Sequence, residues 1–174
     1  MADLTAPLAT DRPQPAGERA GRDSEPVWDI IELLFFAYRD FISDPDEVLA
    51  TFGFGRAHHR VLHFVTRTPG LKVAELLDIL KITKQSLSRV LAQLVQQGFI
   101  IQRPGSQDRR QRLLDLTLKG RELERRLSAP QRARVGNAYS RAGPQAVDGF
   151  REVLLGIIAD EGDRRRFLRW VRDE

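Results

Sequence analysis

The sequence predicts a mainly α-helical protein that carries one small β-hairpin, and three observations support this fold class. First, 41% of the residues are hydrophobic and 30% are charged, which is typical of a soluble globular protein. Second, most of the chain after residue 26 places its apolar residues at helical spacing, in segments separated by glycine and proline. Third, residues 99–116 hold two short apolar runs around a Pro-Gly turn, which is the pattern of a hairpin.

Length and composition exclude several classes of protein. A chain of 174 residues is long enough for one domain with a helical appendage for oligomerisation. It contains no cysteine, which excludes disulfides, thiol-based redox sensing and cysteine-ligated metal sites. No apolar run approaches the ~20 residues needed to span a bilayer, and the first residues lack the basic start and apolar core of a signal peptide. We therefore expect a cytoplasmic protein without a membrane partner.

The N-terminal part is expected to form an arm and one buried helix. Residues 1–25 are rich in Pro, Ala, Gly and charge, and such a segment buries too little apolar surface to fold, so we expect a flexible arm. Residues 27–42 are apolar on more than one face, which predicts a helix buried on several sides. The Ser43-Asp44-Pro45 signal is expected to end this helix. In a chain of this length, the simplest way to bury such a helix is against a partner subunit.

The remaining segments predict five further helices and the hairpin. Turn residues at 68–70 and a short link at 81–82 divide the next part of the chain. Gly98 stands in the usual C-terminal position of a helix, and Gly143-Pro144 breaks a later one. Gly162-Asp163 is expected to interrupt the last helix before a terminal turn. The expected helices cover residues 56–66, 73–80, 83–97, 118–141 and 144–160, and the expected strands cover 99–101 and 112–116.

The helix expected at residues 83–97 divides into an apolar stripe and a polar side. The stripe follows the i, i+3, i+4, i+7 spacing and consists of Leu87, Val90, Leu91, Leu94 and Val95. The polar side supplies donors and acceptors suited to base edges, with Arg or Lys toward guanine and Gln toward adenine. Thr83 is expected to cap the helix, so that its first-turn amides face a phosphate. An ordinary solvated helix face would carry similar residues, so the helix alone leaves its role open. The polar side consists of Lys84, Gln85, Ser88 and Arg89.

The expected hairpin carries a concentrated positive charge. Between Lys81 and Arg112 the chain has seven basic residues and one acid, Asp108, which gives +6 in a chain whose net charge is +4. Such a local excess is expected of a surface that neutralises phosphates. We expect the Asp108 carboxylate to hold the Arg110 guanidinium by a charge-assisted hydrogen bond and to direct it into a narrow minor groove. Arg109 would lie beside them at the tip.

These segments together resemble the MarR family of winged helix-turn-helix regulators. The family signature D-x-R-x-x-x-L-x-L-T-x-x-G is present, and residues 69–100 are similar to the family's third helix, recognition helix and first wing strand. The resemblance covers residues 53–120. Two segments, FGFGRAHHRVLHFV and LDILKITKQSL, are also similar to the PetP-type branch of the family. The matching signature residues are Asp108, Arg110, Leu114, Leu116, Thr117 and Gly120.

The resemblance implies a division into domains, a set of partners and a DNA-binding site. It implies a winged helix-turn-helix domain at residues 51–117, with dimerisation helices at 26–50 and 118–174 that intertwine with those of a second copy. The implied function is sequence-specific binding of double-stranded DNA by a homodimer on a pseudo-palindromic operator, controlled by a small-molecule effector or other signal. No cofactor is implied. The residues expected at the DNA are Thr83, Lys84, Gln85, Ser88, Arg89, Asp108, Arg109, Arg110 and Arg112.

The three histidines of the chain fall in the helix expected at residues 56–66. His58 lies in the middle of the apolar face and is expected to be a packed, hydrogen-bonded core residue. His59 and His63 are i, i+4 neighbours, a spacing at which two imidazoles can share a metal. No Cys, Asp or Glu nearby in the sequence completes a site, so packing or pocket lining is the favoured role. A metal- or haem-responsive regulator that uses this pair is the alternative.

The sequence argues against two other classes of function. No serine-hydrolase elbow, phosphate-binding loop, dinucleotide fingerprint or zinc-protease motif is present, so we expect no catalysis. A winged fold used only for protein interaction is the second alternative. The local charge of +6 argues against it, because a polyanion is the partner that needs such an excess.

Overall fold

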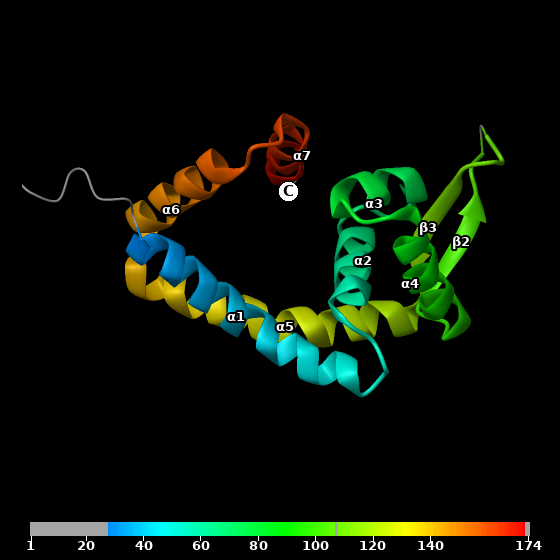
Figure 1. The fold of residues 1–174 in the computed structure, drawn as a ribbon, viewed down its shortest axis with the longest axis horizontal. Coiled ribbons are helices and arrows are strands. Elements are labelled where there is room, and N and C mark those ends of the chain that lie inside the picture. The colour runs from blue at the N-terminus through cyan, green and yellow to red at the C-terminus, as the bar shows by residue number, and fades with distance from the viewer. Residues whose placement is uncertain (1–27, 107, 173–174) are drawn as a thin grey trace, which may run out of the picture. The chain divides into compact units, whose positions relative to one another are not determined.

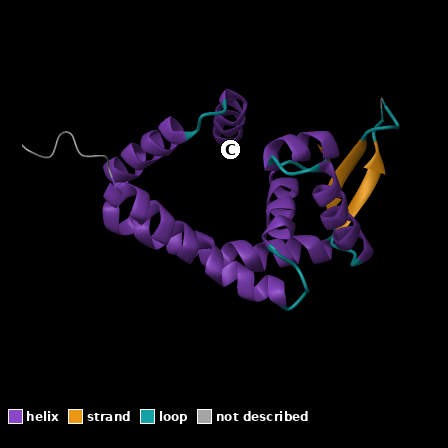
Figure 2. Ribbon diagram, in the orientation of Figure 1, coloured by secondary structure: helices purple, strands orange, loops and turns teal. Residues whose placement is uncertain are grey.

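The computed structural model describes residues 28–106 and 108–172, so the arm expected at residues 1–25 lies outside the described residues. Contacts divide the chain into two units, one that ends at Ala37 and one that begins at Tyr38. Helix α1 (Trp28–Ala50) runs through the boundary between them. The second unit contains, in chain order, α2 (Arg56–Arg67), β1 (Leu71–Lys72), α3 (Val73–Leu80), α4 (Lys84–Gln96), β2 (Ile100–Pro104), β3 (Arg112–Leu116), α5 (Leu118–Ala142), α6 (Pro144–Ile157) and α7 (Glu161–Arg172) (Figure 1, Figure 2).

The mainly helical fold class is confirmed, and the sheet has one strand more than expected. β2 and β3 form the predicted antiparallel hairpin, with Ile100 opposite Leu116 and Pro104 opposite Arg112. The additional strand β1 pairs antiparallel with the other edge of β3, so the strand order is β1-β3-β2. Two residues are too few to show the period-two alternation by which a strand is recognised in a sequence. Only the pairing with β3 makes this segment a strand.

Helix α1 continues to Ala50, past the position where we expected it to end. Pro45 lies inside the helix and is buried. A proline has no backbone N–H, so the Phe41 carbonyl four residues earlier loses its helical donor. The side-chain amide of Gln131, on α5, donates to that oxygen at 3.0 Å. The prediction that Ser43-Asp44-Pro45 ends the helix is therefore wrong, because a side chain from another helix replaces the missing donor.

The buried core lies between α2, α3, α4, the sheet and the first half of α5. Four of the five residues predicted as the apolar stripe of α4 are buried, namely Leu87, Val90, Leu91 and Leu94. Val95 is instead 38% exposed, because it follows Leu94 by about 100° around the helix and turns out of the core. Core residues from other elements include Val61, Leu62 and Val65 of α2, Leu76 of α3, Leu114 and Leu116 of β3, and Leu123 and Leu127 of α5.

The end of α4, the start of β2 and the start of α5 meet at one junction. Thr117 caps α5 by accepting a hydrogen bond from the Gly120 amide at 3.0 Å, and its hydroxyl donates to the Gly98 carbonyl at 2.7 Å. The Lys119 ammonium donates to the Gln97 carbonyl at 2.8 Å. A side chain at Gly120 has no room, because a Cβ would lie 2.1 Å from the carbonyl oxygen of the residue before β2. Thr117 and Gly120, the last two residues of the family signature, therefore hold the start of α5 against the backbone that follows α4.

The C-terminal part forms two helices whose boundary differs from the expectation. α6 ends at Ile157 rather than at residue 160, and α7 is a full helix rather than a terminal turn. The Asp160 carboxylate accepts a hydrogen bond from the Asp163 amide at 3.0 Å and so caps the start of α7. Gly162 therefore lies inside the first turn of α7, and the predicted interruption at Gly162-Asp163 is wrong.

Candidate nucleic-acid interface

The four polar residues predicted to read DNA lie on the exposed side of α4. Thr83 precedes the helix, and its hydroxyl accepts a hydrogen bond from the Ser86 amide at 3.2 Å, which confirms the predicted cap. The N-terminal half of the second helix is the part of a helix-turn-helix unit that meets base edges. We call the exposed side chains at this position the reading face: Lys84, Gln85, Ser88 and Arg89.

The tip of the hairpin is shaped by backbone hydrogen bonds. The Gly105 amide donates to the Gln111 carbonyl at 3.1 Å and closes the loop. The Asp108 carboxylate accepts a hydrogen bond from the Arg110 amide at 2.9 Å, rather than from the Arg110 guanidinium as expected. A carboxylate reaches an amide two residues later within a single turn, so this local bond competes successfully with one to the end of a long side chain. Asp108 therefore orients the backbone at Arg110 and leaves the guanidinium exposed.

Residues far apart in the sequence line one groove beside α4. The groove has a volume of about 530 Å³ and lies between α3, α4 and the hairpin. Lys72 and Gln111 belong to its lining and were not predicted, because neither is part of the helix pattern or of the charged tip. The pairing of β1 with β3 is what places Lys72 there. Five predicted site residues line the groove, Lys84, Ser88, Asp108, Arg110 and Arg112, and the other four lie at exposed positions outside it, Thr83, Gln85, Arg89 and Arg109.

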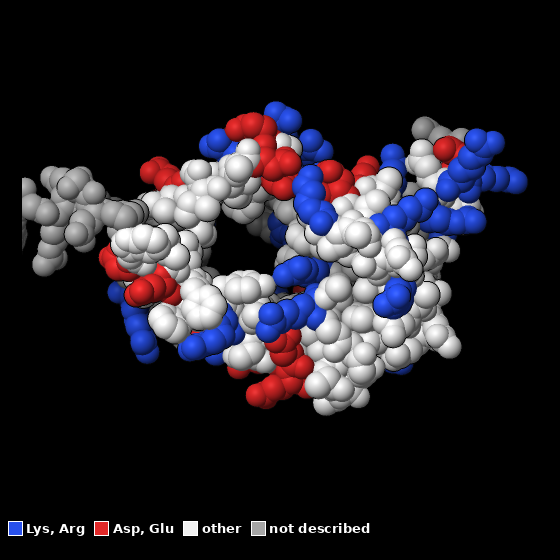
Figure 3. Space-filling view, in the orientation of Figure 1, with Lys and Arg blue, Asp and Glu red and all other residues white. Residues whose placement is uncertain are grey.

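The seven basic residues between Lys81 and Arg112 are not equivalent in the structure. Arg103 donates from Nε to the Asp115 carboxylate at 3.0 Å, and Lys81 pairs with Asp78 at 3.0 Å. Within residues 28–106 and 108–172, the other five have no carboxylate at ion-pair distance. In the space-filling view, basic side chains gather over the hairpin (Figure 3). We call these five the interface cations: Lys84, Arg89, Arg109, Arg110 and Arg112.

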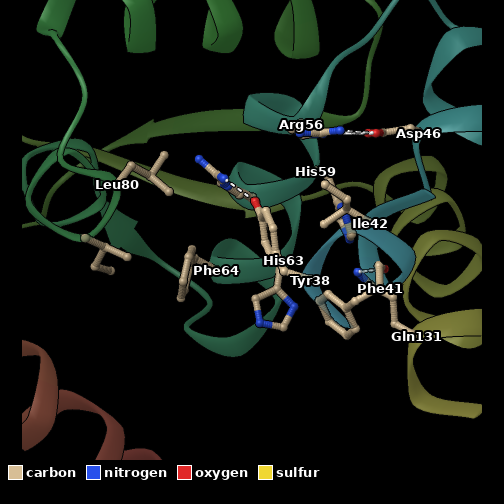
Figure 4. Close-up of a pocket in the computed structure, with 12 residues that line it drawn as sticks. Tyr38, Phe41, Ile42, Asp46, Arg56, His59, His63, Phe64, Leu80 and Gln131 are labelled. Atoms are coloured by element: carbon tan, nitrogen blue, oxygen red, sulfur yellow. Dashed lines mark hydrogen bonds and ion pairs between the residues drawn. The ribbon is translucent and has the colours of Figure 1, made fainter. Parts of the chain in front are cut away.

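A second cavity, which we call the α2 cavity, is lined by α2, α3, α5 and the part of α1 that belongs to the second unit. Its volume is about 370 Å³. Two of its polar contacts are internal pairs. Arg56 donates to Asp46 at 2.9 Å, and Arg60 donates to the Tyr38 hydroxyl at 3.1 Å (Figure 4). The apolar part of the wall is formed by Phe41, Ile42, Phe64, Ile79 and Leu80.

His58 occupies the core position that the sequence predicts. It is buried, and its ring stacks on Phe54 with the centroids 4.5 Å apart. Its Nδ1 accepts a hydrogen bond from the Gly55 amide at 3.1 Å, so Nε2 carries the hydrogen and donates to the Gln93 side chain at 2.7 Å. This histidine therefore ties the start of α2 to α4.

His59 and His63 both line the α2 cavity. His63 Nδ1 lies 3.8 Å from a carboxylate oxygen of Glu124, an acid of α5 that the sequence did not place beside the pair. Hydrogen bonding with His63 holds the pKa of Glu124 below its usual value, and burial lowers the pKa of His59. In the part of the chain that the structure describes, no three potential ligand side chains are grouped closely enough to hold a metal ion.

The helices α2 to α4, followed by a basic hairpin, define a winged helix-turn-helix DNA-binding protein. The chain belongs to the MarR family, whose model matches residues 52–111. The HTH-type transcriptional regulator PetP of Rhodobacter capsulatus is 52% identical to it over 137 residues, which make up 79% of this chain and 82% of that protein. The predicted resemblance to the family and to its PetP-type branch is confirmed.

Solved structures share this fold. A mutant of MarR from E. coli, complexed with operator DNA, matches with a TM-score of 0.58 and 18% identity, over 77% of this chain and 99% of that chain. CouR from Rhodococcus jostii RHA1, bound to p-coumaroyl-CoA, matches with a TM-score of 0.62 and 20% identity, over 74% of this chain and 91% of that chain. At these identities the likeness establishes the fold alone.

Membership of the family defines the general function. The chain is a DNA-binding transcriptional regulator of the PetP type, and regulators of this family are not enzymes. Among the described helices, none combines the length and the apolar character that a membrane span requires.

Proposed function

We propose that this regulator reads a pseudo-palindromic operator as a homodimer in the cytoplasm, and that a small ligand controls its affinity. The observation that carries the proposal is the set of five interface cations. They lie on and around the reading face, and no carboxylate of the described residues lies within ion-pair distance of them. Counter-ions are released when such cations replace them on the phosphates of DNA, and this release drives binding. The arrangement therefore favours a polyanionic partner.

In the proposed complex, α4 enters the major groove and the hairpin reaches an adjacent minor groove. Gln85 and Arg89 carry the bidentate groups that distinguish adenine and guanine in the major groove. Arg110 enters the minor groove, where a narrow groove concentrates negative potential. Arg109 and Arg112 contact phosphates, which position the protein without reading sequence.

A second copy of this chain is the proposed partner of the exposed apolar helix faces. In the first unit, α1 exposes large apolar side chains, among them Trp28 at 63% and Phe35 at 62%. In the second unit, α6 has no buried residue and leaves Val153 and Ile157 more than half exposed. Soluble proteins seldom leave such faces open to water. A two-fold dimer would present two reading faces to major grooves about 34 Å apart, which is the reason for proposing a pseudo-palindromic operator.

The α2 cavity is the proposed site of the controlling ligand. Its volume of about 370 Å³ suits a compact organic molecule. Aromatic and aliphatic side chains supply a surface for an apolar body, while the Arg60 guanidinium and the Tyr38 hydroxyl supply donors for a polar or anionic group. His59 and His63 are part of this lining, so we assign them to the ligand site rather than to a metal.

Binding to enriched and random duplexes tests this function. Operator-like duplexes would be enriched from a random pool, and their affinity compared with that of random duplex by fluorescence anisotropy at about 50 and about 200 mM salt. We expect the enriched duplex to bind at least about 10³-fold more tightly, both affinities to fall steeply with salt, and the enriched sequence to contain two related half-sites. Light scattering should give twice the chain mass of 19.8 kDa.

Three outcomes would contradict parts of the proposal. Equal affinity for the two duplexes would overturn sequence reading. Absence of binding to either duplex would favour the winged fold as a protein-interaction module. A monomer mass would overturn the assignment of the apolar faces to a second copy.

A further inference from the structure

Asp160, just before α7, and Arg166, in the middle of α7, each make an ion pair with the turn of the helix-turn-helix unit. The Arg166 guanidinium lies 2.6 Å from the Asp78 carboxylate, near the end of α3. The Asp160 carboxylate lies 3.4 Å from the Lys81 ammonium, in the link between α3 and α4. These contacts join positions 88 and 79 residues apart in the sequence, and they connect the C-terminal helix directly to the element that aims the reading face.

The other end of α7 packs on α2. The Trp170 ring stacks on Phe64, with the centroids 5.7 Å apart. The Arg67 guanidinium lies 6.0 Å from the same ring, within the range of a cation–π contact. Arg166 lies between the two ends, and 24% of its side chain is exposed, against 56% for its partner Asp78. α7 is thus held at both ends.

Lys81 is the strained point of this turn. Its φ is 50°, and in the described part of the chain it is the one residue other than glycine with a positive φ. A side chain in this region costs conformational energy, so it persists where its surroundings hold it. The Lys81 amide closes α3 by donating to the Leu77 carbonyl at 3.1 Å, and its ammonium lies between Asp78 and Asp160. The direction in which α4 leaves α3 therefore depends on a residue that α7 holds.

We propose that α7 is a brace that keeps the turn between α3 and α4, and with it the reading face, in the orientation that reads DNA. The proposal rests on the reading role proposed for α4. Asp160, Arg166 and Trp170 act as positioning residues, because none of them belongs to the predicted DNA-contact set. Loss of the brace should therefore lower specific binding without removing a phosphate contact.

The two tryptophans of the chain allow docking of α7 to be followed directly. The variant Trp28→Phe leaves Trp170 as the single tryptophan fluorophore. In this background we expect Arg166→Gln to increase quenching of Trp170 by acrylamide, because the freed helix exposes the ring. We expect Arg166→Lys, which keeps the charge, to restore much of the protection. Arg164→Gln is the matched control, since Arg164 pairs with Glu161 within α7 and does not reach α3.

DNA binding by the same Arg166 and Arg164 substitutions decides the proposal, and they are made here with Trp28 retained, because Trp28 lies on the face assigned to the second copy. We expect Arg166→Gln to bind the enriched duplex about fivefold to twentyfold more weakly, with unchanged affinity for random duplex and an unchanged slope of log affinity against log salt. Arg164→Gln should bind as its parent does. Circular dichroism and thermal melting would show that the variant is folded at the assay temperature.

Each contrary result has a distinct meaning. Unchanged discrimination in Arg166→Gln, together with an exposed Trp170, would overturn the brace and leave the proposed function intact. A salt slope reduced by about 1 would overturn it as well, because it would make α7 a DNA contact. A parent protein that does not discriminate the two duplexes would overturn the reading function, and the brace with it.

Discussion

The winged domain has two basic sides that differ in how their charges are satisfied. On the hairpin side, the five interface cations have no acid partner in the described residues. On the paired side, which faces α1 and α7, three cations have a carboxylate within 4 Å, and the pairs are Arg56 with Asp46, Arg166 with Asp78, and Lys81 with Asp160. A count of basic residues does not separate the two sides. Their pairing does, because a neutralised charge has little field left to attract a phosphate.

The largest effect is expected from removing a cation of the hairpin side. Arg110→Ala should weaken binding to enriched and random duplexes alike, by about tenfold or more, and reduce the salt slope by about 1. The measurement is an anisotropy titration across a range of salt concentrations. Arg125→Ala is the matched control, because its guanidinium lies 2.7 Å from Glu122 within α5, and it should bind as the parent does. Equal losses in the two variants would remove the distinction between paired and unpaired cations.

A narrower effect is expected within the hairpin side, between residues proposed to read bases and residues proposed to hold phosphates. Arg89→Gln should relax the preference at a single base pair, by about 1–3 kcal/mol, and leave the other positions of the operator unchanged. Competition with singly substituted duplexes measures this. Gln96→Ala, at the exposed end of the same helix, should leave every preference in place. An equal loss of affinity for all of the duplexes would show that Arg89 contacts a phosphate rather than a base.

The smallest effect is expected on the paired side, and it concerns stability rather than DNA binding. Burial lowers the pKa of His59 from its ordinary value of 6.5 in the folded protein. Above pH 6.5 the imidazole is neutral in both the folded and the unfolded protein, so it does not change the free energy of unfolding. As the pH falls below 6.5, the unfolded chain takes up the proton first, so the folded state loses stability until the folded-state pKa is reached.

Thermal melting between about pH 7 and about pH 5 checks this effect. The melting temperature of the parent should fall as the pH is lowered, and that of His59→Gln should fall less. Glu124 also has a lowered pKa, and its contribution is lost only as the pH falls below its ordinary value of 4.5. If the melting temperatures of the parent and of His59→Gln fall equally with pH, the loss of stability comes from groups other than His59.

The helices could be predicted because each of them separates apolar from polar residues within one window of sequence. The bounds of α3 agree with the prediction for this reason. The errors lie where a distant side chain outweighs a local signal. Pro45 continues α1 because Gln131 supplies the missing donor, and β1 exists because β3 pairs with it. A short stretch of sequence around Pro45 does not contain Gln131, and one around β1 does not contain β3.

The exposed polar side of α4 could be predicted because its residues are neighbours on one helix, and the pairing of the charges could not. Arg103 and Lys81 belong to the same basic stretch as Arg110, yet Asp115 and Asp160 remove them from the interface. Residue type shows how much charge a segment carries. Only the folded chain shows which of that charge is left for a partner.

The junction at Thr117 couples the start of α5 to α4, because the Thr117 and Lys119 side chains donate hydrogen bonds to the backbone carbonyls that follow α4. The 25 residues of α5 span roughly 37 Å at 1.5 Å per residue. In the proposed dimer, a tilt of roughly 5° at the far end of such an arm displaces α4 by roughly 3 Å, close to the ~3.4 Å rise of one base pair. In such a dimer, a small change in how the two α5 helices pack against each other would change the distance between the two α4 helices by about one base pair. The packing of the dimer would therefore set the spacing of half-sites that the protein accepts.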